Sequence, residues 1–254
     1  HPVNRLSLGL QTTHPHLLKA IHRTHTMDDF LQNYHAACTA GFTNINIDLM
    51  FALPGQTLDD WGSTLETIIA LAPRHISAYS LTPAENTPLW DALDAGKTHL
   101  PAEEADRAMY HLAVKLLTEA GYTHYELSNF AKPGFESRHN VNCWRRVPYH
   151  AFGLGAHSFD GGKRWHNTQD MAAYLAGDHA PQDVETLTAA DADAETMILG
   201  LRLLQGVQEK DVPVACESAV LTQIKKGLLA RENGFVRLTA LGLDLANQVF
   251  EAFL

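Results

Sequence analysis

The sequence has 254 residues, of which 45% are hydrophobic, enough for a sizeable core in one large domain or in two smaller ones. Its formal net charge of -10 argues against a general nucleic-acid-binding surface, because phosphate binding requires clustered Lys and Arg. No run of residues approaches the roughly 18 apolar positions of a membrane span. We therefore expect a cytoplasmic globular protein whose partner is a small molecule or another protein.

The three cysteines, Cys38, Cys143 and Cys216, are odd in number and lie far apart. This usage suits a reducing compartment and offers no disulfide framework. The spacing also provides no motif that would bind an iron-sulfur cluster.

The first predicted element is a strand with buried character over residues 5–10, at the very start of the chain. A buried strand needs neighbours on both sides, so we expect further strands of the same sheet upstream; the alternative is a true edge strand. Helical periodicity follows over residues 27–40, then a strand over 44–50. Thr57 is the expected N-cap of the next helix, which runs to about residue 71.

A strand over residues 75–81 and a helix over 102–120 continue this alternation. Strands and helices that alternate at this spacing predict right-handed crossovers and a parallel sheet. In such sheets the chemistry lies at the carboxyl ends of the strands. That rule selects Gln11, Asp48 and Thr82, each at or near the end of a predicted strand.

The last region of the chain has a different pattern. We expect helices over residues 192–204 and 218–230, a short strand pair around 235–238 and a final helix from residue 240. Helices followed by a two-stranded ribbon and another helix are similar to a small winged-helix module. The acidic balance of the chain argues against DNA binding by this module.

The segment from Tyr125 to Phe159 is the part that folding alone explains least. It combines aromatic residues, histidines, arginines and a glycine-rich turn in one loop-like stretch. Long irregular connections are usually functional or disordered, and this one is too aromatic to be disordered. We therefore expect it to carry function.

Seven phrases occur along the chain in a characteristic order: NRLSLGLQ at 4–11, HRTH at 22–25, AGFTNINIDLMFALPGQT at 40–57, HISAYSLT at 75–82, YELSNFA at 125–131, RHNVNCW at 138–144 and GLGAHSF at 153–159. Together they resemble the radical SAM proteins of the oxygen-independent coproporphyrinogen III oxidase type, and among these the HemW-type haem chaperones. The resemblance covers nearly the whole chain.

The resemblance implies an α/β fold: a partial radical SAM (β/α) barrel, then a small helical winged-helix-like domain. It implies three regions, namely the barrel over 1–130, the histidine-motif loop and GLGAHSF segment that complete its pocket over 131–185, and a C-terminal HemN-like domain over 186–254. The family binds a [4Fe-4S] cluster through a C-x-x-x-C-x-x-C loop that this sequence lacks. We expect that loop upstream, in a full-length parent.

Gln11, Arg23 and Asp48 match family positions that contact S-adenosylmethionine. An amide and a carboxylate can bind ribose hydroxyls or the amino group, and an arginine can bind the carboxylate. By the same resemblance, Thr82 and Phe159 line that pocket. The alternative is that Gln11 and Asp48 merely cap strands or helices.

The phrase HNVNCW resembles the H-N-x-x-Y-W motif of HemW-type proteins, in which the histidine is implicated in haem binding. The resemblance makes His139 the tentative ligand of the haem iron, Trp144 a cover for the porphyrin and Arg138, Arg145 and Arg146 partners for its propionates. The chain departs from the motif at Cys143, where tyrosine is usual. This thiol is either a further iron ligand or an inert residue.

The implied function is that of a haem chaperone, which binds haem and passes it to an acceptor haemoprotein. No nucleic acid and no membrane span are expected, although peripheral contact with a membrane acceptor fits the family. The rival interpretation is a coproporphyrinogen III oxidase, an enzyme of porphyrin biosynthesis, and a third is a degenerate barrel that only binds proteins. Without cluster cysteines, this chain alone is not expected to be catalytically competent.

Overall fold

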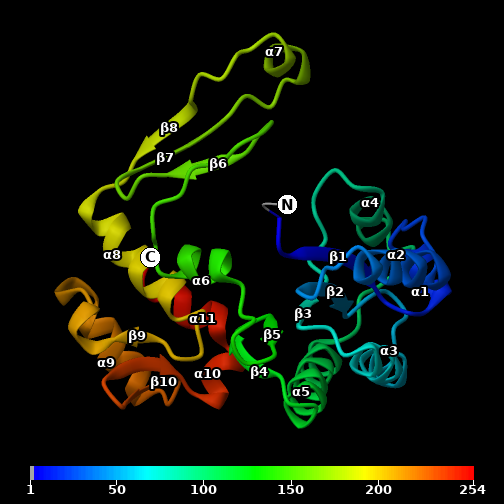
Figure 1. Ribbon diagram of the computed structural model, residues 1–254. Coiled ribbons are helices and arrows are strands. Elements are labelled where there is room, and N and C mark those ends of the chain that lie inside the picture. The colour runs from blue at the N-terminus through cyan, green and yellow to red at the C-terminus, as the bar shows by residue number, and fades with distance from the viewer. Residues whose placement is uncertain (1–2) are drawn as a thin grey trace. The chain divides into compact units, whose positions relative to one another are not determined.

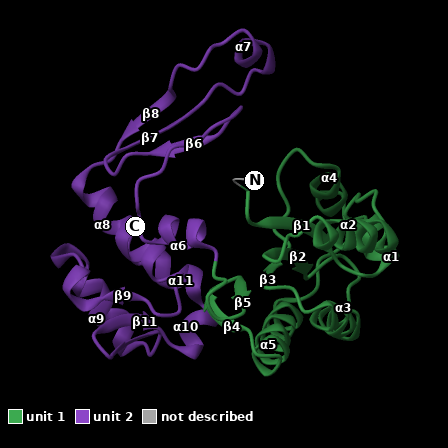
Figure 2. Ribbon diagram, in the orientation of Figure 1, with its two compact units in different colours: residues 1–136 green, residues 137–254 purple. Residues whose placement is uncertain are grey.

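The computed structural model describes residues 3–254, and the chain divides into two compact units, His1–Glu136 and Ser137–Leu254 (Figure 2). The boundary lies close to the end of the expected barrel region at residue 130. The expected division of the second half at residue 185 stays a prediction. No described helix is both long and apolar enough to cross a bilayer.

Unit 1 is built on a five-stranded sheet in the order β1-β2-β3-β5-β4 (Figure 1). Its strands are β1 Leu6–Gln11, β2 Ile45–Phe51, β3 His75–Ser80, β4 Thr123–Glu126 and β5 Asn129–Ala131. As predicted, β1, β2 and β3 are parallel. The expectation of parallel strands fails for β4 and β5, which pair antiparallel with each other and with β3. The two residues that join β4 to β5 are enough for a hairpin but too few for a crossover.

The helices of unit 1 follow the predicted spacing and are α1 Pro15–Ala20, α2 Met27–Thr39, α3 Leu58–Leu71, α4 Pro88–Asp94 and α5 Glu103–Glu119. The predicted N-cap of α3 is confirmed, because the Thr57 hydroxyl accepts a hydrogen bond from the amide of Asp60 and the Asp60 carboxylate accepts one from the amide of Thr57. α2 has the same capping box at Thr26. These local signals fix where the helices begin.

The core of unit 1 lies between the sheet and the helices α2, α3 and α5. Trp61 of α3 is fully buried, and its indole N–H donates to the backbone oxygen of Met109 in α5 at 2.8 Å. β1 was expected to be buried along its whole length, but only Leu10 and Gln11 are buried, whereas Ser7 and Gly9 are exposed. The difference arises because β1 is an edge strand of the described sheet, paired with β2 alone.

Unit 2 contains two three-stranded sheets, in the orders β6-β7-β8 and β10-β11-β9. The strands are β6 His157–Phe159, β7 Lys163–His166, β8 Gln182–Thr186, β9 Val207–Gln208, β10 Leu229–Glu232 and β11 Phe235–Leu238. The α-helices are α6 Arg138–Trp144, α7 Met171–Leu175, α8 Ala189–Gly200, α9 Glu217–Lys225, α10 Ala240–Asp244 and α11 Ala246–Glu251. The sheet β10-β11-β9 with α9 and α10 fits the expected winged-helix-like module.

Two expectations for this half of the chain were wrong. The helix expected over 218–230 ends at Lys225, because Gly227 takes a left-handed conformation (φ 74°) and the chain then enters β10. The stretch from Tyr125 to Phe159 is not a loop throughout, since it contains β5, α6 and β6. Its histidine motif lies on a helix, so its side chains follow helical spacing.

Candidate functional site

The first group of predicted site residues is built around Gln11, which ends β1. Gln11 is 3% exposed and has a positive φ of 73°, a conformation that costs free energy for any residue other than glycine. The register of β1 against β2 shifts between Gly9 and Gln11. A Cβ at Gly9 would lie 2.8 Å from Gln11 Nε2, so a glycine there makes room for the amide. The backbone thus holds this side chain in one buried position.

Asp48 lies on β2, beside β1. Its register partner in β1 is Gly9, and the Asn46 side-chain amide donates to Asp48 Oδ1 at 2.7 Å. Asn46 in turn accepts from Ser77 at 3.2 Å through Oδ1. The carboxylate is half-buried, and one of its oxygens is held by this chain of hydrogen bonds.

Tyr79, near the end of β3, was not singled out by the sequence, and it connects the predicted residues. Its hydroxyl donates to Gln11 Oε1 at 3.4 Å. Burial raises the pKa of Tyr79 and the Asp48 carboxylate raises it further, whereas Arg23 and the bond to Gln11 lower it. Tyr79 therefore lies within electrostatic reach of all three residues. Its place near the end of a parallel strand was the signal that could have identified it.

Arg23 and Thr82 are exposed and line one cavity of ≈ 260 Å³ in unit 1, with residues from β2 and the start of α4. The structure therefore brings Gln11, Asp48 and Arg23 together around Tyr79, and Arg23 together with Thr82. Together these residues offer an amide, a carboxylate, a phenol and a guanidinium, which suit a ligand with hydroxyl, amino and carboxylate groups.

The described residues include no set of cysteines that could bind an iron-sulfur cluster. Cys38, Cys143 and Cys216 are all free thiols. No group of three or more Cys, His, Asp or Glu side chains among residues 3–254 could hold a metal ion. The described side chains therefore do not fit the [4Fe-4S] group that the family implies.

The second group of predicted residues lies on α6 in unit 2. Ser137 caps this helix by accepting from the amide of Asn140. His139 and Cys143 are four residues apart on one helical face, with Cys143 Sγ 3.7 Å from His139 Nε2. The imidazole is exposed, and burial raises the pKa of the thiol. The face thus presents a neutral thiol beside an accessible ring nitrogen.

Trp144, the last residue of α6, is in contact with Arg202, which lies just after α8. The Arg202 guanidinium lies over the indole, 4.5 Å from the ring centroid. The indole Nε1 is buried and has no hydrogen-bond partner in the described chain. Trp144 is thus oriented by a cation–π contact rather than by a hydrogen bond.

Phe159 is placed differently from the other residues expected to contact S-adenosylmethionine, because it belongs to unit 2. It is 3% exposed, and the guanidinium groups of Arg146 and Arg164 lie 5.4 and 5.7 Å from its ring centroid. Both arginines also pair with Glu195, at 3.1 and 2.8 Å. Phe159 is a packed core residue of its own unit, and its role as a cofactor contact stays a prediction.

Comparison with known proteins identifies the family. A model described as the radical SAM superfamily matches residues 1–68. The heme chaperone HemW of Bacillus subtilis is 37% identical over 99% of this chain and 70% of its own length, and that of Lactococcus lactis is 36% identical over 99% and 69%. The HemW protein of Escherichia coli is 31% identical over 99% and 68%.

The fold comparison agrees with the sequence comparison. The solved structure of coproporphyrinogen III oxidase (HemN) from Escherichia coli, a radical SAM enzyme, superposes with a TM-score of 0.77 over 98% of this chain and 64% of that one. At 20% identity this likeness establishes the fold alone. The partial radical SAM fold is thereby confirmed. Given this fold and the identities to HemW proteins, the chain belongs to the HemW family of haem chaperones within the radical SAM superfamily.

Proposed function

We propose that this protein binds haem through His139 of α6 and transfers it to an acceptor haemoprotein. The observation that carries the proposal is the exposed His139 imidazole on a seven-residue helix, in a chain whose relatives are heme chaperones. Imidazole is a common axial ligand of haem iron. An exposed ligand on a short helix suits cargo that must be released as well as bound.

Nε2 of His139 is the atom proposed to meet the iron. Cys143 is the competing candidate, since its sulfur lies 3.7 Å from that nitrogen. Burial raises the pKa of this thiol, which keeps it protonated at neutral pH, and a protonated thiol is a poor iron ligand. The imidazole is therefore the better ligand on this face of α6.

Titration of the full chain with haem, followed by its absorption spectrum, tests the proposal. His139→Ala should lose the spectrum of imidazole-bound iron and bind haem more weakly. His35→Ala is the matched control, because His35 is also an exposed histidine on a helix, α2 of unit 1. Identical spectra and affinities for wild type and both variants would remove His139 as the ligand.

S-adenosylmethionine is the cofactor proposed for the residues of unit 1 that surround Tyr79. Gln11 and Asp48, which lie on strands of the sheet, would bind its ribose or amino group, and Arg23 would bind its carboxylate. When bound beside a reduced iron-sulfur cluster, this cofactor supplies radical chemistry. The described residues offer no such cluster ligands, so no radical step is assigned to them.

The rival function, a coproporphyrinogen III oxidase, rests on the fold shared with HemN. The histidine motif on α6 favours the chaperone. Titration of the full chain with haem and with coproporphyrinogen III would decide between them, since preference for haem supports the chaperone and preference for coproporphyrinogen III supports the oxidase. The proposed setting is the cytoplasm, and the proposed partners are haem and an acceptor haemoprotein, with contact to a membrane acceptor at most peripheral.

A further inference from the structure

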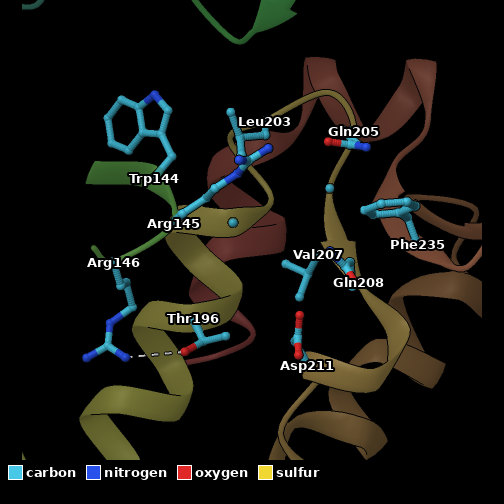
Figure 3. Close-up of a pocket in the computed structure, with 12 residues that line it drawn as sticks. Trp144, Arg145, Arg146, Thr196, Leu203, Gln205, Val207, Gln208, Asp211 and Phe235 are labelled. Carbon is cyan, nitrogen blue, oxygen red and sulfur yellow. Dashed lines mark hydrogen bonds between the residues drawn. The ribbon is translucent and has the colours of Figure 1, made fainter. Parts of the chain in front are cut away.

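Unit 2 contains a cavity of ≈ 500 Å³ at the carboxyl end of α6 (Figure 3). Its walls come from the end of α6, one side of α8, the chain from α8 through β9, and β11. Its lining side chains include Trp144, Arg145, Arg146, Leu203, Asp211 and Phe235. His139 does not line it, so this space is distinct from the position of the proposed iron ligand.

The cavity combines apolar walls with cationic groups at one end. Trp144, Leu203 and Phe235 provide aromatic and aliphatic surface, while Arg145 and Arg146 add two guanidinium groups. In Figure 3, the Arg145 side chain extends from the end of α6 toward Leu203. Flat apolar ligands that carry anionic groups fit such a lining.

Arg145 and Arg146 keep guanidinium N–H groups that no described carboxylate accepts from. Arg145 is exposed and forms no ion pair with any described residue. Arg146 pairs through Nε with Glu195 and donates through Nη1 to Thr196 at 3.4 Å, as the dashed line in Figure 3 marks. Its Nη2 is buried without a hydrogen-bond partner among the described residues. A buried guanidinium nitrogen in this state favours an added acceptor oxygen.

Arg146 is also held in an uncommon backbone conformation, with φ 54°. Directly after α6, this left-handed residue turns the chain so that the guanidinium meets Glu195 and Thr196. Glu195 is shared with Arg164, so one carboxylate serves two guanidinium groups. Arg164 also lies 3.9 Å from Glu185, so Arg145 is the lining guanidinium that has no carboxylate partner among the described residues.

We propose that this cavity receives the carboxylate-bearing side of the tetrapyrrole, with Arg145 and Arg146 binding the propionate groups and Trp144 lying against the macrocycle. The proposal rests on the proposed function, because it takes haem as the cargo. Charge-assisted bonds from guanidinium to carboxylate supply both affinity and orientation.

Iron-free protoporphyrin IX and its dimethyl ester, titrated into the full chain, test the cavity without using the iron. Arg145→Ala should weaken binding of the free acid by about tenfold and leave binding of the ester unchanged within twofold. Arg231→Ala is the control, because Arg231 is an exposed arginine of the same unit that does not line the cavity. Equal losses in both variants, or an equal loss for acid and ester, would overturn the proposal.

Asp211 gives a test of opposite sign. It lines the same cavity and is exposed, so Asp211→Asn removes a repelling charge without disturbing the core. The free acid should then bind about twofold to threefold more tightly, and a weaker or unchanged affinity would count against the proposal.

His139→Ala should leave the binding of iron-free protoporphyrin IX unchanged. If Arg145→Ala has no effect while His139→Ala alters the haem spectrum, the cavity assignment fails and the chaperone function stands; the reverse result removes His139 alone.

Discussion

The candidate residues of unit 1 and those of unit 2 are held in different ways. Gln11 is 3% exposed, ends a strand that is parallel to its neighbour and accepts a hydrogen bond from Tyr79. His139 is exposed on a short helix, and its Nε2 lies 3.7 Å from the Cys143 thiol, a long contact. A sheet that fixes polar groups suits a cofactor that stays in place, because preorganised groups need no rearrangement on binding. An exposed imidazole suits a ligand that is handed on.

The difference between the units extends to their titratable core groups. His75 of β3 is fully buried, and Asn46 and Tyr125 contact its ring nitrogens at 2.6 and 2.8 Å. His124 of β4 stacks on Phe130 at 4.4 Å. In unit 2, His166 of β7 instead forms an ion pair with Asp183 at 2.8 Å. Burial keeps His75 and His124 of unit 1 neutral, whereas His166 of unit 2 has an acidic partner.

The largest expected effect is therefore acid destabilisation of unit 1. Burial lowers the pKa of His75 to about 3 and that of His124 to about 4. Between these values and the ordinary 6.5, the unfolded chain binds protons that the folded chain does not, so stability falls as the pH falls. By pH 4.5 each histidine should remove about 2 to 3 kcal/mol. Residue-resolved hydrogen exchange at pH 7 and pH 4.5 measures the loss.

The same measurement compares the two units directly. Hydrogen bonds to Asn167 and Asp183 raise the pKa of His166, so its stabilising contribution is present at low pH and disappears as the pH rises through the folded value. Unit 2 should therefore keep its protection better than unit 1 on acidification. An equal loss in both units would show that the buried histidines do not decide the response.

The next largest effect is expected for Gly206→Ala in unit 2. Gly206 has φ 82°, and a Cβ there would overlap the Val236 carbonyl oxygen and lie 2.8 Å from Arg237 Cα. Backbone cannot move aside cheaply, so unit 2 should lose about 3 kcal/mol or more. Gly227→Ala is the control, with a similar φ of 74° but nothing within 4 Å of the added Cβ, and should cost about 1 kcal/mol. Urea denaturation of both variants gives the two values.

Gln11→Asn should weaken S-adenosylmethionine binding to unit 1 by about tenfold. Asparagine tolerates the left-handed backbone at this position, so the change shortens the amide without adding strain. Tyr79→Phe should cost about threefold, because it removes one long hydrogen bond to Gln11. Calorimetric titration measures both, with Gln32→Asn on the exposed side of α2 as control. Wild-type affinity in Gln11→Asn would mean that this residue only supports the fold.

The smallest expected effect is that of Cys143→Ala. The thiol contacts the same ring nitrogen that is proposed to meet the iron, so its removal should raise haem affinity by no more than about threefold. Cys38→Ala, at an exposed position of α2, should change nothing. A large loss of haem binding in Cys143→Ala would instead indicate that the thiol is an iron ligand, which contradicts the assignment of His139 as the ligand on this face of α6.

The strands of unit 1 show which site residues could be predicted from the sequence and which could not. The alternation of strands and helices predicted three parallel strands, and the strand-end rule selected Gln11 and Asp48. Gln11 does end β1, whereas Asp48 lies in the middle of β2. Tyr79 escaped that reasoning although it lies near such an end. Its contact with Gln11 depends on the register across β1, β2 and β3 and on the bulge after Gly9, which no single strand specifies.

The sequence analysis did not predict the sheet β6-β7-β8, for a related reason. Its strands have three to five residues each and show no long apolar alternation, so pairing between them, rather than local preference, makes them strands. The hairpin of β4 and β5 was likewise missed because a short connection, not strand composition, sets its direction.

Sequence by itself determined the local signals of this protein: the capping boxes at Thr26 and Thr57, the helical periods and the motif that places His139 four residues before Cys143. These depend on neighbours within one turn of helix or one strand. Only the tertiary structure decided that Tyr79 meets Gln11 and that Arg145 shares a cavity with Phe235. Those contacts join residues far apart in the chain, and packing of whole elements, which no local pattern encodes, brings them together.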